Sequence, residues 1–229
     1  MRIDALFALI ALSAAQAATI GQIDTFEDGT TQGWTVGLLG AVHPAPPANI
    51  ADGGPLGAGD NYLALASLGG SGAGSKLVVL NPAQWAGDYL TLGLTTITMD
   101  LRNSGTTDLS IRLYLENPVT GLPTDDAVTD SVFLPAGGGW THASFDVSEA
   151  GLTVLNGTAA NLLSGVTILR IIHSPAPEFP GPSIVALLDV DNICAGGDCE
   201  NPGGAVPEPS TMGLAAAGLV GIALRLRRA

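Results

Sequence analysis

Positive charge is scarce in this chain of 229 residues, and its shortage excludes one large class of partners. Lys and Arg number 8 against 21 Asp and Glu, which gives a formal net charge of −13. A protein that binds nucleic acid needs a basic patch to neutralise phosphates. We therefore expect no nucleic-acid partner. The many carboxylates are instead oxygen ligands of the kind that Ca²⁺ prefers.

Motifs for catalysis are also missing. The three histidines, His43, His142 and His173, lie far apart in the sequence. Neither a Gly-x-Ser-x-Gly nucleophile elbow nor a His-Glu-x-x-His metal motif occurs. A glycosidase pair of carboxylates is defined by its separation in space, so the sequence leaves that possibility open. We expect a protein that is not an enzyme, with a secreted glycoside-active enzyme as the alternative.

Glycine and proline, in contrast, are abundant, and they separate short apolar runs. The chain has 31 Gly and 15 Pro, while 46% of its residues are hydrophobic, which is too apolar for a disordered chain. Hydrophobic and polar residues alternate strictly along Thr96–Arg102 and Leu109–Glu116, which is typical of half-buried antiparallel strands. We expect these two runs to form a hairpin around the turn Asn103–Asp108.

Eight further runs are typical of strands, and one is typical of a short helix. The expected strands are Ile20–Phe26, Trp34–Leu39, Tyr62–Ser67, Lys76–Leu80, Ser131–Leu134, Thr141–Val147, Thr167–Ile172 and Ile184–Ile193, and the expected helix is Asn156–Ser164. About ten short strands with Gly and Pro turns predict an all-β domain over residues 18–193, an antiparallel β-sandwich of the jelly-roll type. A β-solenoid is the alternative, but no repeat period is visible.

The N-terminal residues 1–17 have the features of a secretory signal peptide. Arg2 precedes the apolar run Ala5–Ala15, and Ala15-Gln16-Ala17 is a small-x-small cleavage site. An N-terminal core helix is the alternative. Export of the chain would place it where disulfides form.

The C-terminal residues 206–229 have a different pattern. Pro207-Glu208-Pro209 interrupts regular structure, Met212–Leu224 contains thirteen uncharged residues, and Arg225, Arg227 and Arg228 follow. A bilayer span needs about twenty residues, and a basic cluster stays on the cytoplasmic side. The pattern predicts a hydrophobic helix that lodges transiently in the inner membrane during export. An ordinary C-terminal membrane anchor is the alternative.

This order of motif, apolar stretch and terminal arginines over Val206–Ala229 resembles the PEP-CTERM sorting tail of Gram-negative bacteria. The resemblance implies recognition by an exosortase-type membrane protease and removal of the tail. It also implies delivery to the cell surface or extracellular matrix, where polysaccharide is the expected partner.

Other segments resemble strands of galactose-binding-like jelly rolls, a fold shared by many carbohydrate-binding modules. They are Asp24-Thr25-Phe26-Glu27-Asp28-Gly29 with Gly33-Trp34 after it, Gly139-Trp140-Thr141 through Phe145, and Leu188–Ile193. The resemblance implies a structural Ca²⁺ where the first and last strands meet. The candidate ligands are Glu27, the carbonyl of Thr25, Asp191, its same-face neighbour Asp189, and Asp52 and Asp60 from a Gly-rich loop. Solvated carboxylates and turn-forming Asp residues are the alternative interpretation.

One loop is a candidate for sugar contact, although aromatic residues are only 5% of the chain. Trp85 and Tyr89 lie beside Gln84 and Asp88, so a ring for stacking adjoins groups that bind hydroxyls. The alternative is a loop whose Trp is anchored in the edge of the core. Trp34 is expected in the core, and Trp140 is either a surface aromatic or a core residue set by a bulge.

The two cysteines, Cys194 and Cys199, are expected to form a disulfide at the start of a linker over residues 194–205. Free thiols are the alternative. Together these features predict an exported, non-catalytic surface protein that associates with polysaccharide through a calcium-stabilised jelly roll. A purely structural surface protein without a ligand is the alternative function.

Overall fold

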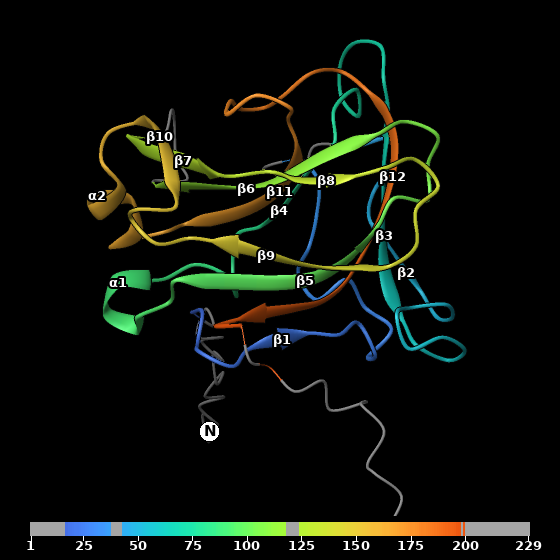
Figure 1. Cartoon of the computed structure of the whole chain (residues 1–229), viewed down its shortest axis with the longest axis horizontal. Coiled ribbons are helices and arrows are strands. Elements are labelled where there is room, and N and C mark those ends of the chain that lie inside the picture. The colour runs from blue at the N-terminus through green and yellow to red at the C-terminus, as the bar shows by residue number, and fades with distance from the viewer. Residues whose placement is uncertain (1–16, 38–42, 118–123, 198, 200–229) are drawn as a thin grey trace, which may run out of the picture. The chain divides into compact units, whose positions relative to one another are not determined.

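Two antiparallel β-sheets lie face to face and enclose the main hydrophobic core (Figure 1). The computed structural model describes residues 17–37, 43–117, 124–197 and 199, all within one compact unit, Met1–Cys199. No helix in these ranges is long and apolar enough to cross a membrane. The predicted sorting tail and all but the last residue of the predicted signal peptide lie outside the described residues.

Each sheet has six strands, and the strands of both sheets are far apart in sequence. Sheet A has the order β2-β3-β12-β5-β9, with β1 also paired with β12, and sheet B has the order β10-β7-β6-β11-β4, with β8 paired with β6. The strands of sheet A are β1 Ile23–Asp24, β2 Ala48–Ile50, β3 Tyr62–Leu68, β5 Thr96–Arg102, β9 Thr141–Asp146 and β12 Val185–Ala195. The strands of sheet B are β4 Val78–Asn81, β6 Leu109–Asn117, β7 Asp125–Thr129, β8 Val132–Leu134, β10 Leu152–Asn156 and β11 Ile168–His173.

Alternation along the strands explains the core. In β5, Ile97, Met99 and Leu101 are all fully buried between the sheets, while Arg102 is on the outward face. The all-β antiparallel sandwich is confirmed, and the described part of the chain contains only two short helices, α1 (Tyr89–Leu92) and α2 (Ala159–Leu163).

The hairpin expected between β5 and β6 is wrong, because the two strands belong to different sheets. The connecting segment turns the chain from sheet A to sheet B around Asn103, which is 1% exposed. The Asn103 side chain donates to the carbonyls of Thr107 and Leu134 and accepts from the backbone N–H of Gly105. A buried amide with these bonds fixes the crossover, whereas alternation alone does not reveal a strand's partner.

Three strands and one helix were not expected from the sequence, namely β2, β7, β10 and α1. Strand β7 begins with Asp125 and Asp126, a pair typical of turns, yet both are buried against α2 and β10. The strand expected over Trp34–Leu39 is wrong in its described part, where Thr35 makes only an isolated bridge to Leu80.

Candidate functional site

The predicted sugar-contact loop faces the core. Trp85 is fully buried, and Tyr89 is 1% exposed with its hydroxyl donating to the carbonyl of Trp85. Neither ring is available to a sugar, so a stacking platform at these two residues is wrong. Asp88 is the N-cap of α1, where its carboxylate accepts from the backbone N–H and hydroxyl of Thr91.

A buried carboxylate explains why this loop turns inward. Asp24 in β1 accepts hydrogen bonds from the indole N–H groups of Trp34 and Trp85, both at 2.8 Å, and from the Gln84 amide at 2.9 Å. Burial raises the pKa of Asp24, and these three donors oppose that rise. Asp24 therefore anchors the loop and both tryptophans to the first strand, and Trp34 lies in the core as expected.

The turn after β1 positions the predicted calcium ligands Thr25 and Glu27. Phe26 between them has a φ of 59°, which is unusual for a bulky residue, and its ring is fully buried. The Phe26 carbonyl accepts from the side-chain amides of Asn49 and Asn61, and its N–H donates to Gln32. These contacts hold the backbone in the left-handed region and fix Thr25 and Glu27 on either side.

Four carboxylates act on one another where this turn meets sheet A. Asp191 in β12 is fully buried, and its pKa is raised to about 8 by burial first and then by the charges of Asp60, Asp100 and Glu27. Asp191 and Asp100 are directly opposed in the β12–β5 register, which places like charges side by side. Burial and the neighbouring Glu27 also raise the pKa of Asp60.

One oxygen in this group lacks a partner. Asp191 Oδ1 accepts from the backbone N–H of Asn192, whereas the buried Oδ2 has no hydrogen-bond partner in the described part of the chain. Glu27 accepts from the backbone N–H of Asn61, and Asp60 accepts from that of Leu56. Glu27 and Asp60 thus lie near enough to Asp191 for their charges to raise its pKa.

The other two predicted calcium ligands are engaged elsewhere. Asp189 forms an ion pair with Arg102, with Nε and Oδ2 2.8 Å apart, and Asp52 is exposed and accepts from the backbone N–H of Gly59. We therefore remove Asp52 and Asp189 from the candidate ligands. Within the described ranges, no three His, Cys, Asp or Glu side chains are arranged so that they alone could hold a metal ion.

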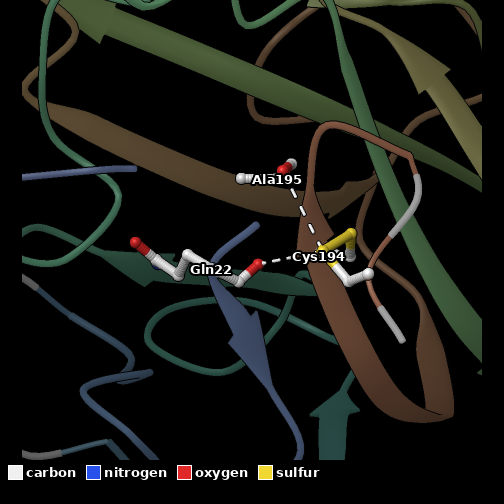
Figure 2. The surroundings of a disulfide bond; sticks show 4 residues. Gln22, Cys194 and Ala195 are labelled. Atoms are coloured by element: carbon white, nitrogen blue, oxygen red, sulfur yellow. Dashed lines mark hydrogen bonds between the residues drawn. A yellow bond between two sulfur atoms is a disulfide. The ribbon is translucent and has the colours of Figure 1, made fainter. Parts of the chain in front are cut away.

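Cys194 and Cys199 are joined by a disulfide at the end of β12, with their Cα atoms 5.8 Å apart. Figure 2 shows the disulfide beside the backbone carbonyl of Gln22, which lies 3.4 Å from the sulfur of Cys199. Cys194 is also the register partner of Ile23 in β1, so the disulfide loop lies next to the first strand.

The outward face of sheet A carries a small aromatic cluster. The rings of Tyr62 and Trp140 meet edge to face with centroids 5.6 Å apart, and the Arg102 guanidinium lies over both. Trp140 and Arg102 also donate to the carbonyl of Gly53. Trp140 is thus a half-buried surface residue that fastens the Gly-rich loop to the sheet.

The outward face of sheet B carries a second aromatic and polar group. Tyr114 and Phe179 stack with centroids 4.0 Å apart and an angle of 12° between their planes, and the Arg170 guanidinium lies over both rings. Arg170 pairs with Glu116, and its buried Nε has no partner among the described residues. Tyr114 donates to Asp126, and burial together with the nearby carboxylates raises the pKa of the Tyr114 hydroxyl.

The same face extends to an exposed ring at the edge of the sheet. Phe133 in β8 is 61% exposed and is the register partner of Ser110 in β6. Cross-strand partners share a face, and so do residues two or four apart on a strand, so Phe133 is on the face of Tyr114. The sequence predicted part of this face, since alternation along Leu109–Glu116 places Arg112 and Tyr114 on the face opposite the apolar residues. The contribution of Phe179 comes from a loop and was not predicted.

Comparison with known proteins identifies the C-terminal tail. Residues 205–228 match the PEP-CTERM protein-sorting motif, which includes Pro207, Glu208, Pro209 and the terminal arginines Arg225, Arg227 and Arg228. No curated protein matches the chain.

Solved structures with a similar fold come from carbohydrate-active proteins. One is a family 11 carbohydrate-binding module from Clostridium thermocellum in complex with a β-1,3-1,4-mixed-linked tetrasaccharide, with 16% identity, a TM-score of 0.51, and coverage of 78% of this chain and 95% of that one. Another is an exo-β-agarase, with 13% identity, a TM-score of 0.52, and coverage of 78% of this chain but only 25% of the agarase. At such identities the similarity shows the jelly-roll sandwich fold alone.

Proposed function

We propose that the protein is an exported, non-catalytic bacterial surface protein whose sandwich binds polysaccharide on the outward face of sheet B. The sorting motif at residues 205–228 supports export, with the inner membrane and an exosortase-type protease as transient partners and a Gram-negative cell surface or matrix as the destination. The fold shared with a carbohydrate-binding module supports the binding role.

The observation that carries the proposal is the composition of this face. Phe133 is exposed and Phe179 is half-buried, and the strand positions beneath them are four residues apart, about 13 Å. Beside the stacked rings of Tyr114 and Phe179 lies Arg170, which is buried, has an unpaired Nε among the described residues and forms an ion pair with the buried Glu116. Aromatic rings that stack on sugars, combined with donors and acceptors for hydroxyls, are what a glycan chain requires.

Binding of the full chain to soluble mixed-linked β-glucan, xylan and agarose tests this proposal. Phe133→Ala and Phe179→Ala should each weaken binding to the preferred polymer at least tenfold. Phe133 is exposed, so Phe133→Ala should leave the unfolding temperature unchanged. The matched control is Leu187→Ala, which removes a 48% exposed apolar side chain from the outward face of sheet A. Unchanged binding by both Phe variants would place the site elsewhere.

Calcium is the cofactor that we propose for the acidic group of Glu27, Asp60 and Asp191. The unpaired Oδ2 of Asp191 supports this assignment, because a buried anion without a partner is costly unless a cation satisfies it. At most two of these carboxylates would bind the ion directly. Together with the Thr25 carbonyl and water, they suit the flexible oxygen coordination of Ca²⁺. The ion would tie the first strand to the last.

A purely structural role is the alternative function. The burial of Trp85 and Tyr89 favours it, since it removes the sugar platform expected from the sequence. Failure of every polymer to bind the wild-type chain would support this alternative.

A further inference from the structure

A polar cavity of about 700 Å³ opens beside the first strand, far from the residues of the sheet B face in sequence. Its lining residues are Thr19, Gln22, Ile23, Asp24, Asp28, Gln32 and Gln84, together with Ala17, the last residue of the predicted signal peptide. The volume is in the range of small-molecule binding sites, which are about 300–1,000 Å³. Three amides and two carboxylates in one cavity are a concentration of hydrogen-bonding groups that the sandwich itself does not require.

One of these groups needs an acceptor. The Gln22 Nε2 atom is buried and has no hydrogen-bond partner in the described part of the chain, while its Oε1 accepts weakly from the Thr19 N–H at 3.4 Å. Figure 2 shows the Gln22 side chain extending away from the disulfide, on the side opposite its backbone carbonyl. An unpaired buried donor is costly, so rotation of the Gln22 side chain toward a ligand oxygen in the cavity would be stabilising.

The charges of the lining restrict what enters. Asp24 and Asp28 are both carboxylates, and none of the described lining residues is a Lys, Arg or His. Acidic sugars and phosphates are therefore repelled. An ammonium group cannot accept from Gln22 Nε2, whereas a hydroxyl both accepts from an amide and donates to a carboxylate. The lining thus selects an uncharged polyhydroxylated ligand.

We propose that this cavity is a second subsite, which binds a single uncharged sugar unit independently of the sheet B face. The proposal deepens the proposed function, on which it rests for the class of ligand. Trp34 and Trp85 are not among the lining residues, but the indole N–H of each donates to Oδ2 of the lining residue Asp24. A sugar in the cavity would change the surroundings of Asp24 and, through it, of both indoles, whereas Trp140 donates to the carbonyl of Gly53 and does not line the cavity.

Tryptophan fluorescence reports occupancy of the cavity. In the full chain carrying Trp140→Phe, emission comes only from Trp34 and Trp85. Titration with glucose, galactose or N-acetylglucosamine should give a saturable change for at least one sugar, with glucuronate binding at least tenfold more weakly than glucose. No saturable change with any neutral sugar would overturn the proposal, and so would equal binding of glucuronate.

Variants separate a binding role of Gln22 from a structural one. Gln22→Leu removes the unpaired donor, so it should preserve or raise the unfolding temperature while weakening sugar binding at least tenfold. A lower unfolding temperature with unchanged sugar affinity would make Gln22 structural and would overturn the assignment. Asp28→Asn should lessen the discrimination against glucuronate.

The cavity and the sheet B face can be tested independently. Phe179→Ala, the variant that tests the sheet B face, should leave the fluorescence titration unchanged. Loss of the titration in Phe179→Ala would show that the two sites are one and would overturn their independence. If the chain bound no polysaccharide but still gave the saturable fluorescence change with a neutral sugar, the cavity would remain a binding site and only the proposed site on sheet B would be wrong.

Discussion

Two buried aspartates close to the first strand differ in how their charge is satisfied. Asp24 is 3% exposed and accepts from three side-chain N–H donors. Asp191 is fully buried, accepts from one backbone N–H, and has an unpaired oxygen among other carboxylates. Asp24 therefore completes a hydrogen-bond network within the protein, whereas Asp191 keeps an unpaired oxygen, to which we assign a calcium ion in our proposal.

The largest effect is expected from breaking the satisfied network. Asp24→Ala leaves both indole N–H groups and the Gln84 amide without their acceptor, and we expect the free energy of unfolding to fall by about 3 kcal/mol or more. Asp191→Asn in the presence of chelator replaces an acid that the folded protein must keep protonated, and it should raise the free energy of unfolding at pH 7 by on the order of 1 kcal/mol. Urea unfolding measures both, with the exposed Asp130→Asn as the control. A similar decrease in the free energy of unfolding in the Asp24 and Asp191 variants would show that the two carboxylates play the same role.

Calcium sharpens the comparison, because it should act on only one of the two aspartates. A ligand that binds only the folded state stabilises it by about 2.7 kcal/mol at a concentration of one hundred times Kd. We expect Ca²⁺ to raise the unfolding temperature of wild type and chelator to lower it. Glu27→Gln and Asp191→Asn should abolish most of this shift. Calorimetry with and without chelator measures the effect, and a wild type indifferent to chelator would contradict the calcium assignment.

The pH dependence without calcium gives a smaller effect. The pKa of Asp191 rises from 3.8 to about 8 on folding, so between these values the folded protein holds a proton that the unfolded chain has lost. The free energy of unfolding should therefore fall as the pH rises from 5 to 8, by on the order of 1–3 kcal/mol. In Asp191→Asn the slope should be smaller but not zero, since the pKa values of Asp24 and Asp60 are also raised. A slope equal to that of wild type would exclude Asp191 as its source.

The smallest effect is expected from the disulfide, which closes only a short loop next to the β1–β12 pairing. Replacing both cysteines with Ala should lower the free energy of unfolding by about 2 kcal/mol at most. The shift produced by Ca²⁺ should survive in this variant, because the Asp191 side chain does not depend on the loop. If Ca²⁺ no longer raised the unfolding temperature of this variant, the proposed calcium site would depend on the disulfide.

The sequence predicted the positions of many strands, because the alternation that marks a strand involves only residues close together in the sequence. Alternation located β5 with its bounds and β6 to within one residue. Pairing could not be predicted in the same way, since the assignment of β5 and β6 to different sheets depends on a buried Asn103 whose partners include the carbonyl of Leu134. Strand β7 was missed because its opening Asp125 and Asp126 are satisfied by groups distant in sequence, among them Thr158 and Tyr114.

The candidate sites were predictable to a different degree. The candidate ligands Glu27 and Asp191 followed from a family resemblance, which includes the long-range pairing of the first and last strands, whereas Asp60 was expected from its glycine-rich loop. The burial of Trp85 could not be read from its loop, because its indole partner Asp24 is 61 residues earlier in the chain. Phe179 lies in a loop without strand alternation, so no local pattern linked it to Tyr114.

The position of β12 has a consequence for how the chain folds. It is the last strand in sequence, yet it is a central strand of sheet A and pairs with β1, β3 and β5. Sheet A therefore cannot assemble until nearly the whole domain has been synthesised, and its closure joins segments of large sequence separation, which makes folding slow. A chain that reaches its final sheet order late is still incompletely folded during synthesis, and an incompletely folded polypeptide is easier to thread through a membrane than a closed sandwich.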